Sequence, residues 1–151
     1  VGSAPQGITE RISVGSGGVE PNGASTWAAI SADGRYVAFV SAASNLVAAD
    51  NNGHSDAFVY DRETGATELA SVDSAGNPAN GDSDNPRTSA NGRYVAFVSA
   101  ADNLVAADAN GHSDVFVHDR QTGATELVSP GAAPNGANGE SGAPAISADG
   151  R

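Results

Sequence analysis

The sequence lacks cysteine, methionine and lysine altogether, and these absences exclude several kinds of protein. Without cysteine there is neither a disulfide scaffold nor a thiolate metal site. Without lysine, the seven basic residues are all arginine and stand against 18 acidic residues, for a formal net charge of −11. Nucleic acids and anionic membranes require a basic patch on their partners. We therefore expect neither as a partner, whereas so acidic a chain can attract cations.

Long apolar runs are also missing. No stretch approaches the roughly 20 apolar residues that a membrane span needs. No signal-like segment stands at the start, so any targeting segment would have been removed or would lie outside this sequence. Apolar residues do not recur with the 3.6-residue period of a helix. Nineteen glycines and many alanines, serines and asparagines predict instead an all-β chain of short strands and many turns.

What the sequence does contain is a repeat that returns every 58 positions. The pentapeptide Ser-Ala-Asp-Gly-Arg at 31–35 returns with one change at 89–93 and unchanged at 147–151. The segments 31–72 and 89–130 are identical at 34 of 42 positions. Such identity at a fixed spacing indicates recent duplication of one structural unit.

Each unit predicts four short strands. The second strand, Tyr-Val-Ala-Phe-Val-Ser, is apolar on both faces and must be covered on both sides. The fourth carries Thr and Glu, as an exposed outer strand would. Asp-Gly or Asn-Gly follows the first strand and signals a tight turn. The first strand of the unit is predicted at 26–31, 85–89 and 143–147, and the second at 36–41 and 94–99. The third is predicted at 57–60 and 115–118. The fourth is predicted at 66–72 and 124–129, with 8–14 as an additional fourth strand.

Covered inner strands and a polar outer strand predict four-stranded antiparallel propeller blades in tandem. The expected division is an outer strand of a preceding blade at 1–14, blades at 15–72 and 73–130, and the first strand of a further blade at 131–151. A ring needs about four to eight blades, and the chain holds about 2.6 units. We therefore expect a partial propeller, completed by further blades from the same longer chain or from other copies.

These motifs resemble the WD-like propeller repeat of the TolB family, which is also found in the propellers of prolyl-oligopeptidase-type enzymes. The matching elements are the Ser-Ala-Asp-Gly-Arg turn, the Tyr-Val-Ala-Phe-Val strand and the Val-Tyr-Asp-Arg-x-Thr-Gly strand and turn. Because propellers host many unrelated activities, the resemblance is specific for fold. It is poorly specific for function. Our first hypothesis is a non-enzymatic binding or scaffold module, extracellular or periplasmic, with a protein or carbohydrate ligand. A propeller segment of a larger hydrolase and a self-assembling surface protein are the alternatives.

The loop between the second and third strands is the candidate site. Both units contain Asp-x-Asn-Gly-x-x-Asp, and Ca²⁺ takes six to eight oxygens from carboxylates, amides and carbonyls. Integrin-type propellers have similar calcium loops, but Ala48 and Ala106 stand where those carry their first Asp. A plain turn, in which Asp and Asn cap backbone N–H groups, is the alternative. The candidate ligands are the side chains of Asp50, Asn52 and Asp56 and the backbone carbonyl of His54. The arrangement is repeated by Asp108, Asn110, His112 and Asp114.

The other distinctive residues do not indicate a catalytic or zinc site. No Gly-x-Ser-x-Gly nucleophile motif occurs, and we predict no catalytic residues. His54 and His112 have no second His or Cys in their loops, so we expect their side chains in solvent and not on zinc. Glu68 and its repeat Glu126 are expected in solvent on outer strands. Trp27 has no aromatic counterpart in the other units and is expected in the core of its blade, with ligand stacking as the alternative.

Overall fold

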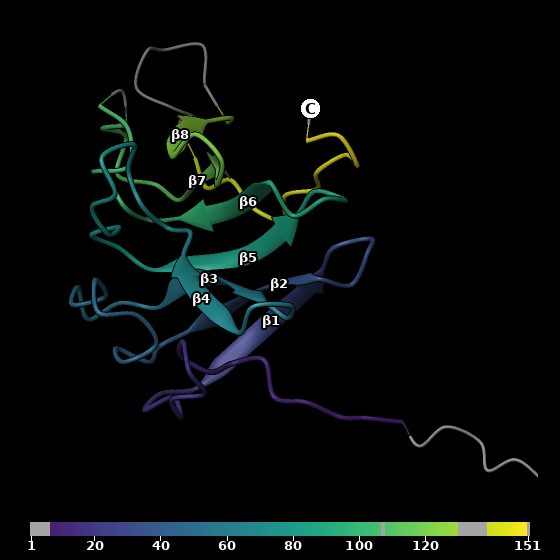
Figure 1. Cartoon of the computed structure of the whole chain (residues 1–151). Coiled ribbons are helices and arrows are strands. Elements are labelled where there is room, and N and C mark those ends of the chain that lie inside the picture. The colour runs from purple at the N-terminus through teal and green to yellow at the C-terminus, as the bar shows by residue number, and fades with distance from the viewer. Residues whose placement is uncertain (1–6, 107, 130–138, 151) are drawn as a thin grey trace, which may run out of the picture.

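The computed structural model describes residues 7–106, 108–129 and 139–150. These residues contain two four-stranded antiparallel sheets that lie one against the other (Figure 1). The predicted all-β class and the four-stranded units are confirmed, and we name the sheets blade 1 and blade 2. Blade 1 consists of β1 (Ser25–Ile30), β2 (Tyr36–Ser41), β3 (Asp56–Asp61) and β4 (Ala66–Leu69). Blade 2 consists of β5 (Ser83–Thr88), β6 (Tyr94–Ser99), β7 (Asp114–Asp119) and β8 (Ala124–Leu127).

The two inner strands of each blade pair along their whole length. In blade 1 the pairing runs from Tyr36 opposite Asp61 to Ser41 opposite Asp56. β6 and β7 have the same register one unit later. Every residue of β2 after Tyr36 is buried, so this strand is covered on both faces, as its apolar sequence predicts.

Each blade has two chemically different faces, because successive side chains of a strand point to opposite sides. The Phe face carries a stacked pair of rings, with centroids 5.7 Å apart in blade 1 and 5.9 Å apart in blade 2. The opposite face, here named the small face, carries only Ala and Val among its apolar residues at the centre of the sheet. In blade 1 the Phe face holds Phe39 and Phe58, and the small face holds Ala38, Ala57, Val59 and Ala70. In blade 2 the Phe face holds Phe97 and Phe116, and the small face holds Ala96, Val115, Val117 and Val128.

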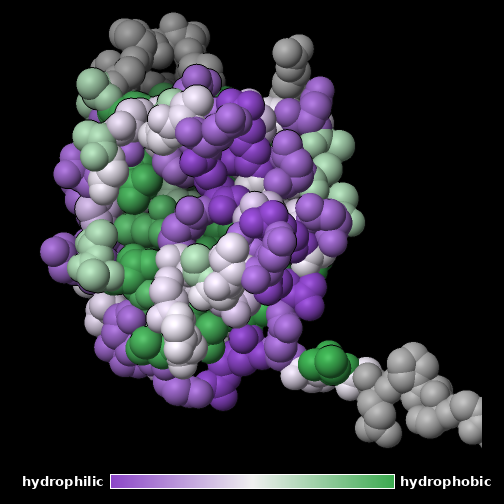
Figure 2. Space-filling model, in the orientation of Figure 1, coloured by the Kyte–Doolittle hydropathy of each residue, from purple (hydrophilic) through white to green (hydrophobic). Residues whose placement is uncertain are grey.

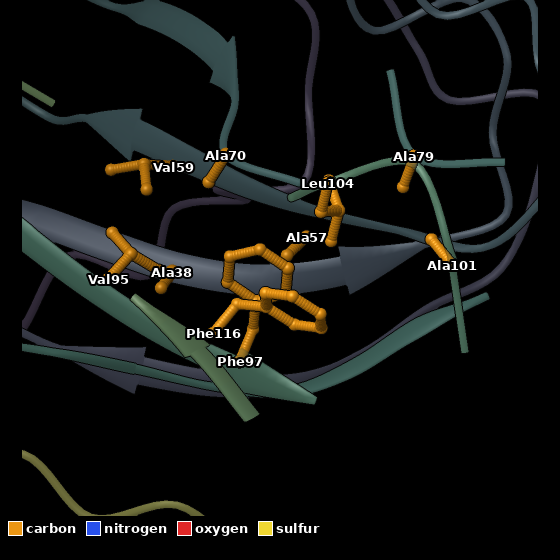
Figure 3. Packing of buried hydrophobic residues seen from close by; sticks show 10 residues of the cluster. All are labelled: Ala38, Ala57, Val59, Ala70, Ala79, Val95, Phe97, Ala101, Leu104 and Phe116. Atoms are coloured by element: carbon orange, nitrogen blue, oxygen red, sulfur yellow. The ribbon is translucent and has the colours of Figure 1, made fainter. Parts of the chain in front are cut away.

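The Phe face of blade 2 packs on the small face of blade 1 and forms the larger apolar core. In Figure 3 the rings of Phe97 and Phe116 lie together beside Ala38 and Ala57. Leu104, from the loop after β6, closes the same cluster. Bulky rings thus fill the space that small side chains leave on the neighbouring blade, and burial of this apolar surface holds the two blades together.

Ion pairs between neighbouring units repeat with the period of the sequence. Glu68 on β4 pairs with Arg120 in the turn after β7, and Glu10 pairs with Arg62 one unit earlier. The side chain of Glu68 is 48% exposed, as expected for an outer strand. The ion pair was not expected: stacking brings the outer strand of one unit beside the Asp-Arg turn of the next. Glu126 has no such arginine among the described residues.

Residues 7–14, predicted as the outer strand of a preceding blade, form no strand. They nevertheless lie where such a strand would. Thr67 Oγ1 donates a hydrogen bond to the carbonyl of Val14, and Thr125 Oγ1 donates one to the carbonyl of Val72 in the same way. An outer strand pairs with the third strand of its own blade. The given sequence contains no third strand with which residues 8–14 could pair.

Residues 139–150, here named the C-terminal arm, lie along blade 2 as the start of a further unit. Ser141 N donates to the carbonyl of Ser113 over 2.7 Å, and Ser83 N donates to that of Ser55 over the same distance. The predicted strand at 143–147 is not formed, since the second strand of its unit is absent. The rest of that predicted segment, 131–138 and Arg151, lies outside the described residues, as do residues 1–6 at the other end.

Trp27 lies on the surface, so the expectation that it fills the core is wrong. The residue is 54% exposed, and its backbone has a φ of 52°. The pairing of β1 with β2 is bulged between Thr26 and Ala29. A bulge re-aims the side chains that it contains, and Trp27 lies within this one.

The face shown in Figure 2 is mostly hydrophilic, with hydrophobic residues exposed in patches. In the part of the chain that the structure describes, no helix is long and apolar enough to cross a membrane. The large hydrophobic residues that are exposed are Ile8, Val19, Trp27, Ile30 and Val128.

Candidate cation site in the blade loops

The loop from β2 to β3 places Asp50 inside the blade. The residue is only 5% exposed, and its N–H donates to the carbonyl of Val47 over 3.2 Å. Burial raises the pKa of the Asp50 carboxyl, and the N–H of Asn52 partly opposes this shift. The Oδ2 atom of Asp50 is buried and accepts no hydrogen bond from the described residues. Asp108 repeats this arrangement in blade 2, with its own Oδ2 unsatisfied and its pKa raised by burial.

Asp56, the first residue of β3, is the second carboxylate of the site. It is completely buried. Its Oδ1 accepts the hydroxyl of Ser71 over 2.6 Å, and its Oδ2 accepts the side-chain amide of Asn52 over 2.7 Å. Burial raises the pKa of Asp56 to about 6, and the nearby charge of Asp50 acts in the same direction. The two carboxyl groups thus share one poorly solvated space.

The same pair exists in blade 2. Asp114 accepts the amide of Asn110 over 2.5 Å and the hydroxyl of Ser129 over 2.7 Å. The charge of Asp114 contributes to the raised pKa of Asp108. In each blade the charge of one aspartate thus raises the pKa of the other, Asp50 acting on Asp56 and Asp114 on Asp108.

The asparagine does not present an oxygen to this pair. Asn52 Oδ1 accepts the N–H of His54 over 2.9 Å, while its Nδ2 donates to Asp56 and to the carbonyl of Ala79. Asn110 makes the same turn, with Oδ1 on the N–H of His112. This geometry is the side-chain-capped turn that was the alternative to a calcium loop.

The histidines face the next unit. His54 Nδ1 lies 3.2 Å from an oxygen of Asp82, and this oxygen also accepts the N–H of Ser55. His112 is placed likewise beside Glu140. Asp82 and Glu140 were not selected from the sequence, although the acidic residue recurs at the period of the repeat in an otherwise Gly- and Asn-rich link.

Two carboxylates per blade define what the site can do. Among the described residues, no group of three or more His, Cys, Asp and Glu side chains gathers around one point. Two oxygen-bearing carboxylates suit a hard cation such as Ca²⁺, which also accepts carbonyls and water as ligands.

The comparisons with known proteins concern the fold. No protein-family model matches the chain, and no curated protein matches its sequence. Two solved structures are similar to it: a protein assigned as TolB from Agrobacterium tumefaciens, with 17% identity and a TM-score of 0.47 over 70% of this chain, and TolB from Acinetobacter baumannii, with 20% identity and a TM-score of 0.48 over 87% of this chain. The matched part is 30% and 25% of those chains, so this chain spans less than a third of their length.

Within each sheet the strands run in sequence order, β1-β2-β3-β4 and β5-β6-β7-β8, and the two sheets stack face to face. These are the features of propeller blades. The chain therefore has the all-β fold of a partial β-propeller with two complete four-stranded blades.

Proposed function

We propose that the chain is part of a non-enzymatic β-propeller that acts as a binding or scaffold module outside the cell or in the periplasm, and that a Ca²⁺ ion stabilises the loops of each blade. The ion would lie against Asp50 and Asp56 in blade 1 and against Asp108 and Asp114 in blade 2. The observation that carries the proposal is the unsatisfied, buried Oδ2 of Asp50 and of Asp108, each beside a second buried aspartate.

The two buried carboxylates of each loop carry an electrostatic cost. A buried carboxylate without a full set of hydrogen bonds costs several kcal/mol, and a second buried carboxylate beside it adds repulsion. Either a proton or a bound cation removes this cost. The arrangement recurs with the same atoms in the next unit, which supports a shared role for the two loops.

The ligand set favours weak binding. Two carboxylates leave most of the six to eight coordination positions to backbone carbonyls and water, and the capped Asn52 adds no oxygen in this conformation. Extracellular calcium modules bind with dissociation constants of about 10⁻⁴–10⁻³ M. An affinity in that range fits a protein exposed to extracellular or periplasmic calcium.

The scaffold role is supported by the stacking. The two blades share a continuous apolar core and the ion pair of Glu68 with Arg120, so they hold surface loops in fixed positions, as binding surfaces require. The ligand, a protein or a carbohydrate, is to be identified by experiment.

Thermal unfolding in calcium and in chelator tests the cation. A ligand that binds only the folded state stabilises it by about 1.4 kcal/mol per site at ten times its dissociation constant. We expect Tm to rise by several degrees between excess chelator and 5 mM Ca²⁺, and less with 5 mM Mg²⁺, which tolerates irregular sites poorly.

The variant Asp50→Asn combined with Asp108→Asn should abolish the shift, since it removes one carboxylate from each site. In chelator it should be at least as stable as the parent, because it also removes the repulsion. Asp33→Asn is the control: Asp33 lies in an exposed turn, and Asn91 stands at the same place in the next unit. No calcium-dependent shift in the parent, or an equal shift in the double variant, would overturn the cation proposal.

A further inference from the structure

The small face of blade 2 is open, whereas that of blade 1 is covered. Val59 and Ala70 in blade 1 are completely buried under blade 2. Their repeats are Val117, which is half-buried, and Val128, which is 46% exposed. A cavity of about 640 Å³ lies between this face and Ile146 of the C-terminal arm. Blade 2 therefore presents the same kind of surface that blade 1 uses to hold a neighbour.

The opposite end of the molecule presents the other half of this interface. β1 is largely exposed, with Ile30 58% exposed beside the exposed Trp27. In blade 2 the same strand, β5, packs against β1, β2 and β3, and Thr88, the repeat of Ile30, is half-buried. Blade 1 thus has an uncovered first strand with apolar side chains.

Charges at the two ends are complementary. Glu126, at the edge of the open face, repeats Glu68, whose partner is Arg120. Arg62 repeats Arg120 and lies on blade 1, where it pairs with Glu10. An interface between the two ends would place Glu126 beside Arg62 at the spacing of the pair that already joins the blades.

We propose that a second copy of this chain docks head to tail, with its blade 1 on the small face of blade 2 of the first copy. The docked copies would reproduce the interface between blade 1 and blade 2 within one chain. Since the units are identical at 34 of 42 positions, most residues of that interface have counterparts at the two ends. Phe39 and Phe58, the counterparts of the rings that fill it, are already buried in a cluster with Ile12 and the loop after β2. Residues 7–14 must therefore move before the Phe face of blade 1 can dock.

The closest contact of the interface shows the fit. A Cβ atom on Gly92 would lie 2.1 Å from the ring of Tyr36, and one on Gly150 would lie 2.1 Å from the ring of Tyr94. A glycine in this turn is thus needed where a tyrosine of the preceding unit presses against it. Gly34 is the same residue of blade 1, and within the single chain it has no tyrosine against it. In the docked pair, Gly34 would lie on Tyr94 of the other copy.

The C-terminal arm occupies part of the docking surface. Ala148 accepts a hydrogen bond from the N–H of Ala90 over 3.1 Å, where Ala90 itself accepts one from Ala32 over 3.0 Å. A docking copy must displace this arm, and its own residues 7–14 must give way to β8. These exchanges make association weak and dependent on concentration. Because the interface is heterologous, repeated docking gives either a closed ring or a filament.

Mass measurement by sedimentation velocity across roughly 5 to 500 µM, with calcium and again with chelator, tests the proposal without reliance on the cation site. Trp27 is the single tryptophan and lies on the docking strand, so its emission should shift to shorter wavelength as mass increases. We expect mass to rise with concentration in the parent.

Gly34→Ala should abolish this rise, because the added methyl group would meet Tyr94 of the other copy. Gly76→Ala is the matched control: Gly76 has a φ of 86°, against 74° for Gly34, and a Cβ there meets nothing within 4 Å. Both variants carry the same kind of backbone strain, so only a docking contact separates them. Equal association of the two variants would overturn the proposal.

Ile146→Asp tests the arm. It should loosen the arm from the open face and so strengthen association at least several-fold, whereas non-specific sticking would fall when an apolar side chain is removed. If the parent and Ile146→Asp both stay monomeric at every concentration, the proposal is wrong, and a further blade of the same chain is the better occupant of this face.

Discussion

Three equivalent residues, Trp27, Asn85 and Ala143, have positive φ angles of 52°, 50° and 49°. The left-handed conformation costs an L-residue with a side chain roughly 1–2 kcal/mol, and asparagine is among the few that adopt it readily. The bulge of the first strand therefore suits Asn85 better than the bulky and exposed Trp27. The tryptophan is a local strain that packing does not explain.

Replacement of Trp27 tests whether its backbone is strained. Trp27→Asn should raise the free energy of unfolding by about 0.5–1 kcal/mol, since it relieves backbone strain and removes an exposed indole. Chemical denaturation at a low protein concentration, at which copies stay apart, measures the change. Trp27→Phe keeps an aromatic ring on the same backbone and should give no such gain. An asparagine variant less stable than the phenylalanine variant would contradict the strain argument.

The aspartates of the candidate site were within reach of sequence reasoning, whereas their surroundings were not. Asp50 and Asp56 stand out because they recur around a glycine in both loops. The partners of Asp56 are different: Ser71 lies 15 residues away, after β4. Which way the amide of Asn52 turns is decided by a local backbone N–H, and residue spacing does not reveal that choice.

At the scale of elements, an arginine holds the start of each second strand to the end of the third. Arg35 donates two hydrogen bonds to Asp61, Nε to Oδ1 over 3.0 Å and Nη2 to Oδ2 over 2.8 Å. Arg93 binds Asp119 in the same way over 2.8 and 2.7 Å. Bidentate pairs of this kind are the strong form of the ion pair. Hydrogen bonds from Arg35 hold the pKa of the Asp61 carboxyl well below its usual range.

The pH dependence of stability follows from this pair. Asp61 and Asp119 ionise more readily in the folded than in the unfolded chain, so their contribution is complete above the unfolded pKa of about 4 and is lost as the pH falls below it. The destabilisation caused by Arg35→Gln should therefore be largest above pH 5 and shrink steadily towards pH 2. Urea unfolding of the parent and the variant at several pH values measures the difference. Arg87→Gln is the control, since the guanidinium of Arg87 donates to the carbonyl of Pro86 and not to a carboxylate. A difference that is constant from pH 7 to pH 2 would contradict the assignment.

Strands were predictable where both strands of a pair are present. The limits of β2 and β6 agree with those expected from the sequence, and β4 ends three residues earlier than expected. Residues 8–14 and 143–147 carry strand-like sequences but form no strands. A strand is completed by hydrogen bonds to a neighbour, so local sequence alone could not decide these two segments.

At the scale of the whole molecule, the blades meet at a contact that leaves no room. Gly92 of blade 2, with a φ of 70°, lies on the ring of Tyr36 of blade 1. The guanidinium of Arg120 lies over the same ring, 4.3 Å from its centroid. Tyr36 is therefore enclosed by two residues of the next unit.

A methyl group at Gly92 should force the blades apart. Gly92→Ala carries the strain of a positive φ and an overlap with Tyr36, and we expect it to cost about 1–3 kcal/mol more than Gly76→Ala, which carries the strain alone. Calorimetric unfolding of the two variants gives the comparison. Equal losses would show that the ring can move aside and that the contact between blades is loose.

Stacking itself could be inferred from the sequence, because a strand that is apolar on both faces requires cover on both. The ion pair of Glu68 with Arg120 could not. It joins residues 52 positions apart in neighbouring units, and only the relative placement of two blades brings an outer strand beside the following turn.

The near-identity of the units has a consequence for how the chain reaches its structure. β2 and β6 have the same sequence, as do β4 and β8. During refolding β3 can therefore also pair with β6, at the small extra cost of closing a longer loop. The chain must discriminate through the few substituted positions, such as Ala57 against Val115 in the third strands. Kinetic traps with exchanged strands are a characteristic failure of repeat proteins. We expect refolding from denaturant to show a slow phase that Ala57→Val, which makes the third strands still more alike, lengthens.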